Sequence, residues 1–259
     1  MGGANNICSD KTGTLTIGQP AINEVVSLSA WDQTKIMQYI ASINNSSGHP
    51  LADATLKYAK AKEISLLEVE EFNSVTGKGV QGKIRNNQIL VGNKALMNQY
   101  EVQISAQIME KAHDFQQQGN TVSFLSVDGD LKGLVSISDQ IKETSKSAID
   151  ALHNMGIKIV MMTGDNELAA KHVADALGID EIYANSLPQD KQAKIKFYQD
   201  KGLTVAMTGD GINDAPALAQ SDVGIAMGTG TDIAIESAEL TLIKGDLQGI
   251  VKAIKLGQA

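Results

Sequence analysis

The chain has 259 residues, of which 42% are hydrophobic, 20% charged and 4% aromatic, and its net charge is −8. This length and balance are typical of a globular protein with one large or two modest domains. The negative charge and the scarcity of rings argue against a nucleic-acid partner, because phosphate binding needs clustered Lys and Arg and base stacking needs aromatic side chains.

The single cysteine, Cys8, excludes an internal disulfide framework and is typical of a reducing compartment. No stretch approaches the roughly 18 consecutive apolar residues of a membrane span. The first six residues are too polar for a signal peptide. We therefore expect the chain as given to be soluble.

The chain opens with one predicted strand, residues 7–10, which carries Asp10 at its C-terminal end. After Pro20 the pattern changes to a mixture of helices and alternating strands. Helical spacing of apolar residues predicts helices over 33–43, 50–59 and 105–118. Runs rich in β-forming residues predict strands over 68–75, 80–85, 88–91, 121–127 and 131–137, with a tight turn at Asn86-Asn87. The middle block is thus predicted to be an α+β domain with an antiparallel sheet.

From about residue 142, strands and helices alternate strictly. Strands are predicted over 157–162, 181–183, 203–207 and 223–226, and helices over 142–154, 167–177, 188–199, 216–219 and from 246 onward. This alternation is typical of an α/β fold with a doubly wound, Rossmann-like parallel sheet. We expect strand 7–10 to lie centrally in that sheet. Residues 1–24 and 131–259 would then form one domain, and residues 25–130 a second domain inserted into it.

Three of the predicted parallel strands end in polar turns. Asp10 ends the first, Thr163-Gly164-Asp165 follows the second, and Thr208-Gly209-Asp210 follows the third. Ligands of open parallel sheets bind beyond the carboxyl ends of the strands. A carboxylate that attacks a phosphoryl group needs a divalent cation, backbone donors and a cationic side chain around it. These turns therefore predict a site for phosphoryl transfer.

The residues around these turns supply each part of such a site. Asp10 is the predicted nucleophile, which would form an aspartyl phosphate, and Asp10 and Asp210 would hold Mg²⁺. Thr163 and the amides of the glycine turns would surround the phosphate oxygens. Lys191 would offset the charge of the transferring group, and Asp214 completes the predicted catalytic set.

The run from Cys8 to Thr16, Cys-Ser-Asp-Lys-Thr-Gly-Thr-Leu-Thr, resembles the phosphorylation motif of P-type ATPases, the cation-pumping branch of the haloacid-dehalogenase-like superfamily. Residues 163–165 and 208–216 resemble two further signatures of that family. The resemblance covers nearly the whole chain. It implies a phosphorylation domain over 1–24 and 131–259 and a nucleotide-binding domain over 25–130, with ATP as phosphoryl donor and Mg²⁺ as cofactor.

The same resemblance implies further roles for residues in the first two turns. Thr12 would offer its backbone carbonyl to Mg²⁺, and Thr12, Gly164 and Asp165 would contact the nucleotide. Many phosphatases of the superfamily carry an aspartate at the position of Thr12 as general acid and base. Threonine cannot fill that role, so a longer-lived phosphoenzyme is expected.

The inserted block carries a narrower resemblance. Ser-Gly-His-Pro-Leu at residues 47–51 resembles the Ser-Glu-His-Pro-Leu motif of heavy-metal-transporting P-type ATPases, and residues 77–80 and 92–93 resemble two nucleotide-contacting motifs of the same subfamily. The resemblance implies that His49 contacts adenine, that the backbone approaches the nucleotide at Gly77 and Gly79, and that Asn93 makes a polar contact. Glycine permits such close approach, and imidazole can hydrogen-bond a base.

Two residues depart from this subfamily pattern. Gly48 stands where the family has a glutamate before the histidine, and Asn44 stands where a second glutamate is often found. These departures predict that ATP binds with altered affinity or base selectivity. Residues 222–247 resemble the copper-transporting branch most closely.

The resemblance as a whole implies the cytoplasmic catalytic unit of a copper-type pump, an integral membrane protein whose actuator and transmembrane domains would be its partners. The chain itself is expected to be monomeric. Two other functions stay open: a soluble phosphatase of the same superfamily, and a nucleotide-binding regulatory module. Thr12 argues against the first. The set of Asp10, Lys191, Asp210 and Asp214 exceeds what binding alone requires.

Overall fold

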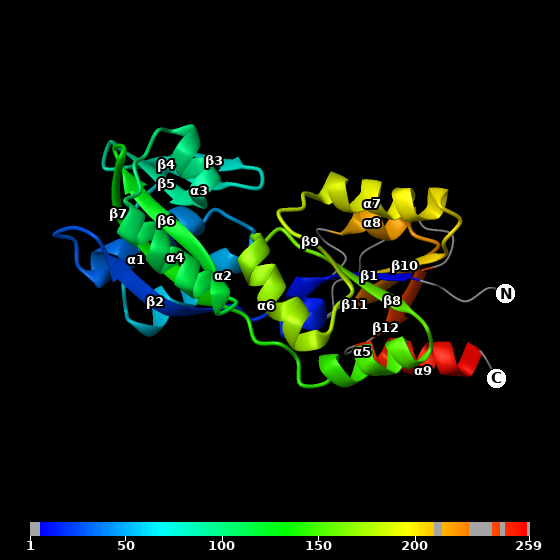
Figure 1. Cartoon of the computed structure of the whole chain (residues 1–259). Helices are drawn as coiled ribbons and strands as arrows, with labels where there is room; N and C mark the ends of the chain where they lie inside the picture. The colour runs from blue at the N-terminus through cyan, green and yellow to red at the C-terminus, as the bar shows by residue number, and fades with distance from the viewer. Residues whose placement is uncertain (1–5, 210–213, 228–239, 244–246, 258–259) are drawn as a thin grey trace. The chain divides into compact units, whose positions relative to one another are not determined.

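The structure is a computed structural model that describes residues 6–209, 214–227, 240–243 and 247–257 (Figure 1). The chain divides into two compact units. Unit 1 comprises Met1–Gly18 and Gln140–Ala259, and unit 2 comprises Gln19–Asp139. The division falls after Gly18 and Asp139 rather than after residues 24 and 130, because β2 (Ala21–Ser27) and β7 (Asp130–Ser138) pair with each other in the sheet of unit 2.

The described residues of unit 1 form a six-stranded sheet in the order β12-β11-β10-β1-β8-β9, with every neighbouring pair parallel. Its strands are β1 (Asn6–Asp10), β8 (Lys158–Met162), β9 (Glu181–Tyr183), β10 (Val205–Gly209), β11 (Val223–Met227) and β12 (Leu240–Ile243). β1 lies between β10 and β8, which confirms the predicted central position of the strand that carries Asp10.

Helices cover both faces of this sheet (Figure 1). They are α5 (Ser145–Asn154), α6 (Glu167–Leu177), α7 (Pro188–Asp200), α8 (Ala215–Gln220) and α9 (Leu247–Gly257). Side chains alternate between the two faces: Ile7 packs in the core with α5, α6 and α9, whereas Cys8 packs in the core with α7 and α8. Because both faces are buried, the strands are apolar runs rather than alternating ones, as expected for a parallel sheet.

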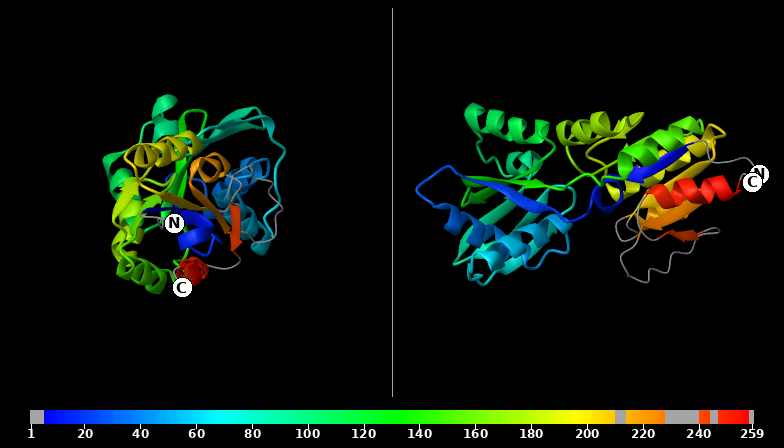
Figure 2. Two further views of the ribbon diagram at one scale, coloured as in Figure 1. Left: turned by 90° about the vertical axis from the view of Figure 1, so that its right-hand side faces the viewer. Right: turned by 90° about the horizontal axis from the view of Figure 1, so that it is seen from below.

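Unit 2 is a six-stranded antiparallel sheet in the order β2-β7-β6-β5-β4-β3. Its other strands are β3 (Glu70–Val75), β4 (Gly79–Ile84), β5 (Asn87–Gly92) and β6 (Thr121–Val127), and its helices are α1 (Gln33–Asn44), α2 (Pro50–Ala61), α3 (Lys94–Gln99) and α4 (Ala106–Gln117). One face of the sheet packs on α1 and α2 and the other on α3 and α4 (Figure 2, right). Unit 2 therefore has a core on each side of its sheet.

Some elements differ from the sequence prediction. The tight turn between β4 and β5 is at Arg85-Asn86, one residue earlier than predicted, and both residues have positive φ, 50° and 65°. This backbone is that of a two-residue hairpin turn. β10 extends to Gly209, past its predicted end. β2, α3 and β12 lie where no element is predicted.

Within the described part of the chain, every helix is too short or too polar to span a bilayer.

Candidate active site

Asp10 is the last residue of β1 and leads into a wide turn, η1 (Lys11–Leu15). The Thr16 amide closes the turn by donating to the Lys11 carbonyl at 3.0 Å. Inside it, Gly13 has φ 77°, a conformation that glycine adopts without steric cost. The turn therefore holds a buried carboxylate at the carboxyl edge of the sheet, where ligands of parallel sheets bind.

Lys191 joins this carboxylate to a second one. Its Nζ donates to Asp10 Oδ1 at 2.9 Å and to Asp214 Oδ1 at 2.7 Å. All three residues are buried, with 6%, 8% and 0% of Lys191, Asp10 and Asp214 exposed. Burial alone would lower the pKa of Lys191, but the negative charges of Asp10 and then Asp214 outweigh it and hold the pKa above its ordinary value. The structure thus brings the predicted nucleophile, the predicted cation and a second carboxylate together.

Local sequence explains why these side chains converge. α7 begins at Pro188, and its first turn is capped because the Leu187 amide donates to Asp190 Oδ2 at 2.8 Å. Lys191 follows in that first turn. Asp214 stands just before α8, in space left by Gly209: a Cβ at Gly209 would lie 2.8 Å from the Cγ of Asp214. Glycine at 209 is therefore what lets the Asp214 carboxylate reach Lys191.

The turn after β8 is tied to the turn after β1. Thr163 is buried, and its Oγ1 accepts from the Asp165 amide at 3.1 Å. The Asp165 carboxylate forms a salt bridge with Lys11, whose side chain is also buried. Lys11 is not among the sequence-predicted site residues, although its place directly after the nucleophile is a signal that could have marked it. A Cβ at Gly164 would meet its nearest atom only at 3.7 Å, so packing does not require glycine there.

His49 is the residue of unit 2 that is predicted to contact adenine. Its ring is exposed, and its Nδ1 accepts from the Leu51 amide at 3.2 Å as the cap of α2. Because Nδ1 accepts, the ring hydrogen of the neutral imidazole is assigned to Nε2, which is then a donor. Gly48 is exposed, with no atom within 4 Å of a built Cβ among the described residues. Asn44 is buried and donates to Thr55 Oγ1 at 3.1 Å between α1 and α2.

The predicted glycines of unit 2 lie at the start of β4. Gly77 has φ 72° and Gly79 has φ 147°, and a Cβ at Gly79 would lie 2.6 Å from the Cα of Gly92. Asn93 holds this turn: its Nδ2 donates to the Gly77 carbonyl at 2.9 Å while its Oδ1 accepts from the Leu96 amide at 3.1 Å. Asn93 therefore links the turn to the N-terminus of α3.

Sequence comparison identifies the family. The profile described as haloacid dehalogenase-like hydrolase matches residues 5–222, and a second profile of the same description matches residues 192–254. The chain belongs to the haloacid dehalogenase-like hydrolase family.

Particular relatives narrow this assignment. A copper-transporting P-type ATPase from Rhizobium leguminosarum bv. viciae is 46% identical over 250 residues, which is 96% of this chain and 30% of that protein. A copper-exporting P-type ATPase from Staphylococcus epidermidis is 43% identical over 255 residues, which is 98% of this chain and 32% of that protein. The chain therefore spans about a third of the length of these curated relatives.

Solved structures similar to this chain come from the same class of protein as these relatives. The structure of the catalytic CPx-ATPase domain CopB-B has a TM-score of 0.68 and 33% identity, over 98% of this chain and 88% of that one. A second structure, from a study of conformational changes in the catalytic domain of the CPx-ATPase CopB-B upon nucleotide binding, has a TM-score of 0.63 and 32% identity. The match covers 86% of this chain and 80% of that one. Within the haloacid dehalogenase-like family, the chain is thus a catalytic domain of CPx-ATPase type, and the predicted fold class is confirmed.

The haloacid dehalogenase-like site offers oxygen ligands to a metal. Asp214 Oδ2 and Thr208 Oγ1 are buried and have no hydrogen-bond partner among the described residues. Carboxylate, hydroxyl and carbonyl oxygens suit Mg²⁺. No cluster of three or more His, Cys, Asp or Glu side chains able to hold a metal occurs among the described residues. Asp210, the predicted second metal ligand, lies outside them, so Mg²⁺ binding there stays a prediction.

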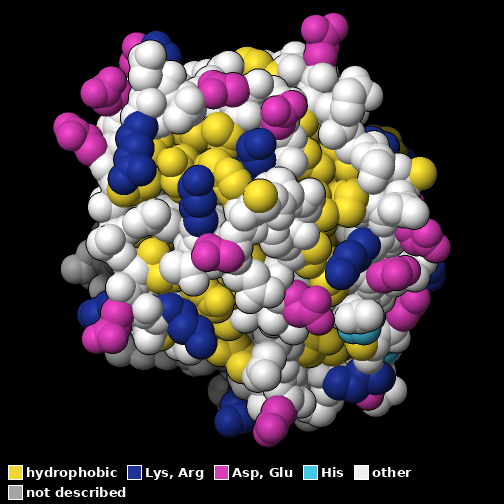
Figure 3. Space-filling model, turned by 90° about the vertical axis from the view of Figure 1, so that its left-hand side faces the viewer, with side chains coloured by type: hydrophobic (Ala, Val, Ile, Leu, Met, Phe, Trp, Pro, Cys, Tyr) yellow, Lys and Arg dark blue, Asp and Glu magenta, His cyan; other side chains and the backbone are white. Residues whose placement is uncertain are grey.

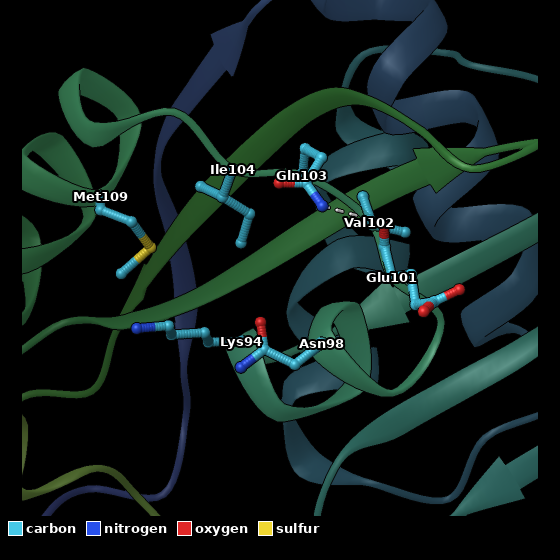
Figure 4. Close-up of a pocket in the computed structure, with 7 residues that line it drawn as sticks. All are labelled: Lys94, Asn98, Glu101, Val102, Gln103, Ile104 and Met109. Carbon is cyan, nitrogen blue, oxygen red and sulfur yellow. Dashed lines mark hydrogen bonds between the residues drawn. The ribbon is translucent and has the colours of Figure 1, made fainter.

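The structure also has a cavity and a charged surface that the predicted site residues do not explain. A cavity of about 410 Å³ in unit 2 is lined by α3, α4 and the segment between them, including Lys94, Glu101 and Met109 (Figure 4). It contains none of the predicted nucleotide-binding residues. On the face shown in Figure 3, basic and acidic side chains are interspersed rather than gathered into the basic stripe that nucleic acid requires.

Proposed function

We propose that this chain is the ATP-binding and autophosphorylating catalytic unit of a heavy-metal-transporting P-type ATPase, with copper as the transported metal. The observation that carries the proposal is the Lys191 ammonium between Asp10 and Asp214 at the carboxyl edge of the sheet. The names of the copper-transporting relatives support the choice of metal. In the full-length protein, the actuator and transmembrane domains would be its partners and the catalytic unit would face the cytoplasm.

The proposed reaction is transfer of the ATP γ-phosphate to Asp10. A carboxylate oxygen of Asp10 attacks the γ-phosphorus, the new P–O bond forms, the bond to the β–γ bridging oxygen breaks, and ADP leaves. Lys191, which donates to Asp10, offsets charge on the transferring group. The Thr163 hydroxyl and the Gly164 amide would donate to the phosphate oxygens. Mg²⁺, held by Asp10, Asp210 and the Thr12 carbonyl, would neutralise further negative charge on the phosphates.

In unit 2 the proposed nucleotide contacts are His49, Gly77, Gly79 and Asn93. Thr12, Gly164 and Asp165 are proposed to contact the phosphate end, although the carboxylate of Asp165 already pairs with Lys11. Because Asn44 is engaged between two helices, the adenine end depends on the exposed His49 ring. Titration calorimetry with ATP and GTP would measure the resulting selectivity. Undetectable ATP binding at millimolar concentration would contradict the proposal.

The decisive test is acid-stable labelling from γ-labelled ATP with Mg²⁺. The unmodified chain is expected to retain label, and Asp10→Asn to retain none, because the amide cannot form the acyl phosphate while it can still accept from Lys191. Asp175→Asn, which removes an exposed carboxylate paired with Lys171, is the matched control and should label normally. Label that persists in Asp10→Asn would reject the nucleophile assignment.

A soluble phosphatase remains the second candidate function, since the family profile is that of a hydrolase. Thr12 speaks against it because its side chain cannot act as general acid or base. Hydrolysis of p-nitrophenyl phosphate much faster than phosphorylation by ATP would favour the phosphatase.

A further inference from the structure

The chain leaves unit 1 and returns to it through two segments that are bound to each other. We call residues 16–18 and 140–142 the strap. The Ile17 amide donates to the Gln140 carbonyl at 2.8 Å, Thr16 forms an antiparallel bridge with Ile141, and the Lys142 amide donates to the Leu15 carbonyl at 3.0 Å. The strap therefore begins where the turn that follows Asp10 ends.

Two residues of the strap contact Gly13, the middle residue of that turn. The Lys142 ammonium donates to the Gly13 carbonyl at 3.0 Å. Gly18 is packed so closely that a Cβ there would lie 2.8 Å from the Cα of Gly13. The Gly13 amide is also engaged, since it donates to Thr16 Oγ1 at 3.3 Å. Both polar backbone groups of Gly13 are thus fixed.

Fixing Gly13 also fixes its neighbour. The Gly13 N–H and the Thr12 carbonyl belong to one rigid, trans peptide plane, so they point in opposite directions. With the N–H held by Thr16, the Thr12 carbonyl must point away from Thr16. Thr16 thus sets the orientation of the Thr12 carbonyl, whereas the Lys142 side chain, 129 positions from Gly13 in sequence, holds the next peptide plane through the Gly13 carbonyl.

We propose that Lys142 is a positioning residue for phosphoryl transfer to Asp10, because its ammonium fixes the Gly13 carbonyl and with it the shape of the turn that starts at the nucleophile. This inference rests on the proposed function of Asp10. It gives Lys142 no contact with the reacting atoms. It also means that the two connections between the units are held directly against the nucleophile's own turn.

The test compares Lys142→Met, which keeps the aliphatic stem, with Lys142→Arg, which restores a charged donor. Lys146→Met is the matched control, because Lys146 is exposed and pairs with Asp150 one turn away within α5. Lys142→Met should slow phosphorylation by ATP at least about tenfold, since a charged hydrogen bond is lost. Its Kd for ATP should change by less than about twofold, and Lys142→Arg should recover most of the rate.

Amide hydrogen exchange of residues 13–16 without ligand gives a second readout. These amides should exchange faster in Lys142→Met than in the unmodified chain or in Lys146→Met. An unchanged phosphorylation rate in Lys142→Met, an equal loss in Lys146→Met, or no recovery in Lys142→Arg would overturn the inference. If the unmodified chain forms no phosphoenzyme, the proposed function fails, and unchanged exchange at 13–16 would then refute the role of Lys142 on its own.

Discussion

At the scale of single residues, the charge balance around Lys191 sets what the site can accept. Asp10 and Asp214 contribute two negative charges and Lys191 one positive charge, so the buried triad keeps one net negative charge. A triphosphate is also anionic, so it would be repelled unless a cation came with it. If the site binds ATP as proposed, the triad by itself would favour the metal-bound nucleotide over the free one.

Gly209 offers a direct test of this arrangement. In Gly209→Ala the new methyl group would lie 2.8 Å from the Asp214 Cγ, so the carboxylate must move away from Lys191. We expect a loss of stability of about 1–3 kcal/mol from overpacking. We also expect phosphorylation to fall by much more than ATP binding does. Urea unfolding and phosphoenzyme assays would measure both.

Gly48→Ala is the steric control for Gly209→Ala, because no described atom lies within 4 Å of its built Cβ. Its stability should stay within about 0.5 kcal/mol of the unmodified chain. A Gly209→Ala protein with normal phosphorylation would show that the position of Asp214 is not critical.

At the scale of elements, Asn93 couples the cap of α3 to the turn at Gly77. Asn93→Ala removes the cap and should lower stability by about 1 kcal/mol. Asn93→Asp keeps a good capping oxygen but loses the donor to the Gly77 carbonyl. We expect Asn93→Asp to keep its stability and to bind ATP more weakly. Equal ATP affinity in Asn93→Asp and the unmodified chain would contradict this.

Asp180 joins three elements of unit 1. Its Oδ2 accepts from the Ile159 amide in β8 at 2.8 Å and lies 2.8 Å from Nε2 of His153 in α5, just before β9. Partial burial raises its pKa, but the hydrogen bonds from Ile159 and His153 outweigh this and hold the pKa below its ordinary value of 3.8. A lowered folded-state pKa gives stability that is present above 3.8 and is lost as pH falls through the folded value.

Asp180→Asn should therefore be less stable than the unmodified chain near neutral pH, by about 1 kcal/mol or less because the carboxylate is partly screened by solvent. The difference should shrink as pH falls below the ordinary pKa of aspartate. Urea unfolding over a pH series measures it. Asp175→Asn, in an exposed ion pair, should show little effect at any pH. A pH-independent deficit in Asp180→Asn would refute the linkage.

Elements with strong periodicity could be predicted from sequence, and weakly patterned ones could not. The apolar strands β1, β8 and β10 and the long helices follow from their patterns. β2 was missed because only Val25 in it is buried, so it has little alternation. α3 has six residues, too few for helical spacing to show. In the site, Asp10, Lys191 and Asp214 could be named from motifs, whereas the partners of Lys11, Asn44 and Asn93 depend on tertiary contacts that local sequence does not encode.

At the scale of the whole molecule, the two units have separate sheets and separate cores. Unit 2 is continuous in sequence, and its ends are the paired strands β2 and β7. We therefore expect residues 19–139 alone to unfold cooperatively in urea and to bind ATP within about threefold of the full chain. Circular dichroism and calorimetry would check this. A fragment without a cooperative transition would show that unit 2 depends on unit 1.

The central position of β1 has a consequence for synthesis of the chain. β1 pairs with β8 from Lys158 onward and with β10 from Val205 onward, so Asn6 meets its β10 partner 199 residues later (205 − 6). All of unit 2 leaves the ribosome before either partner strand exists. The strand that carries Asp10, with its apolar Ile7 and Cys8, therefore has no partner strand while the inserted unit is synthesised. We expect its late docking to make assembly of the parallel sheet the slow, aggregation-exposed step of folding.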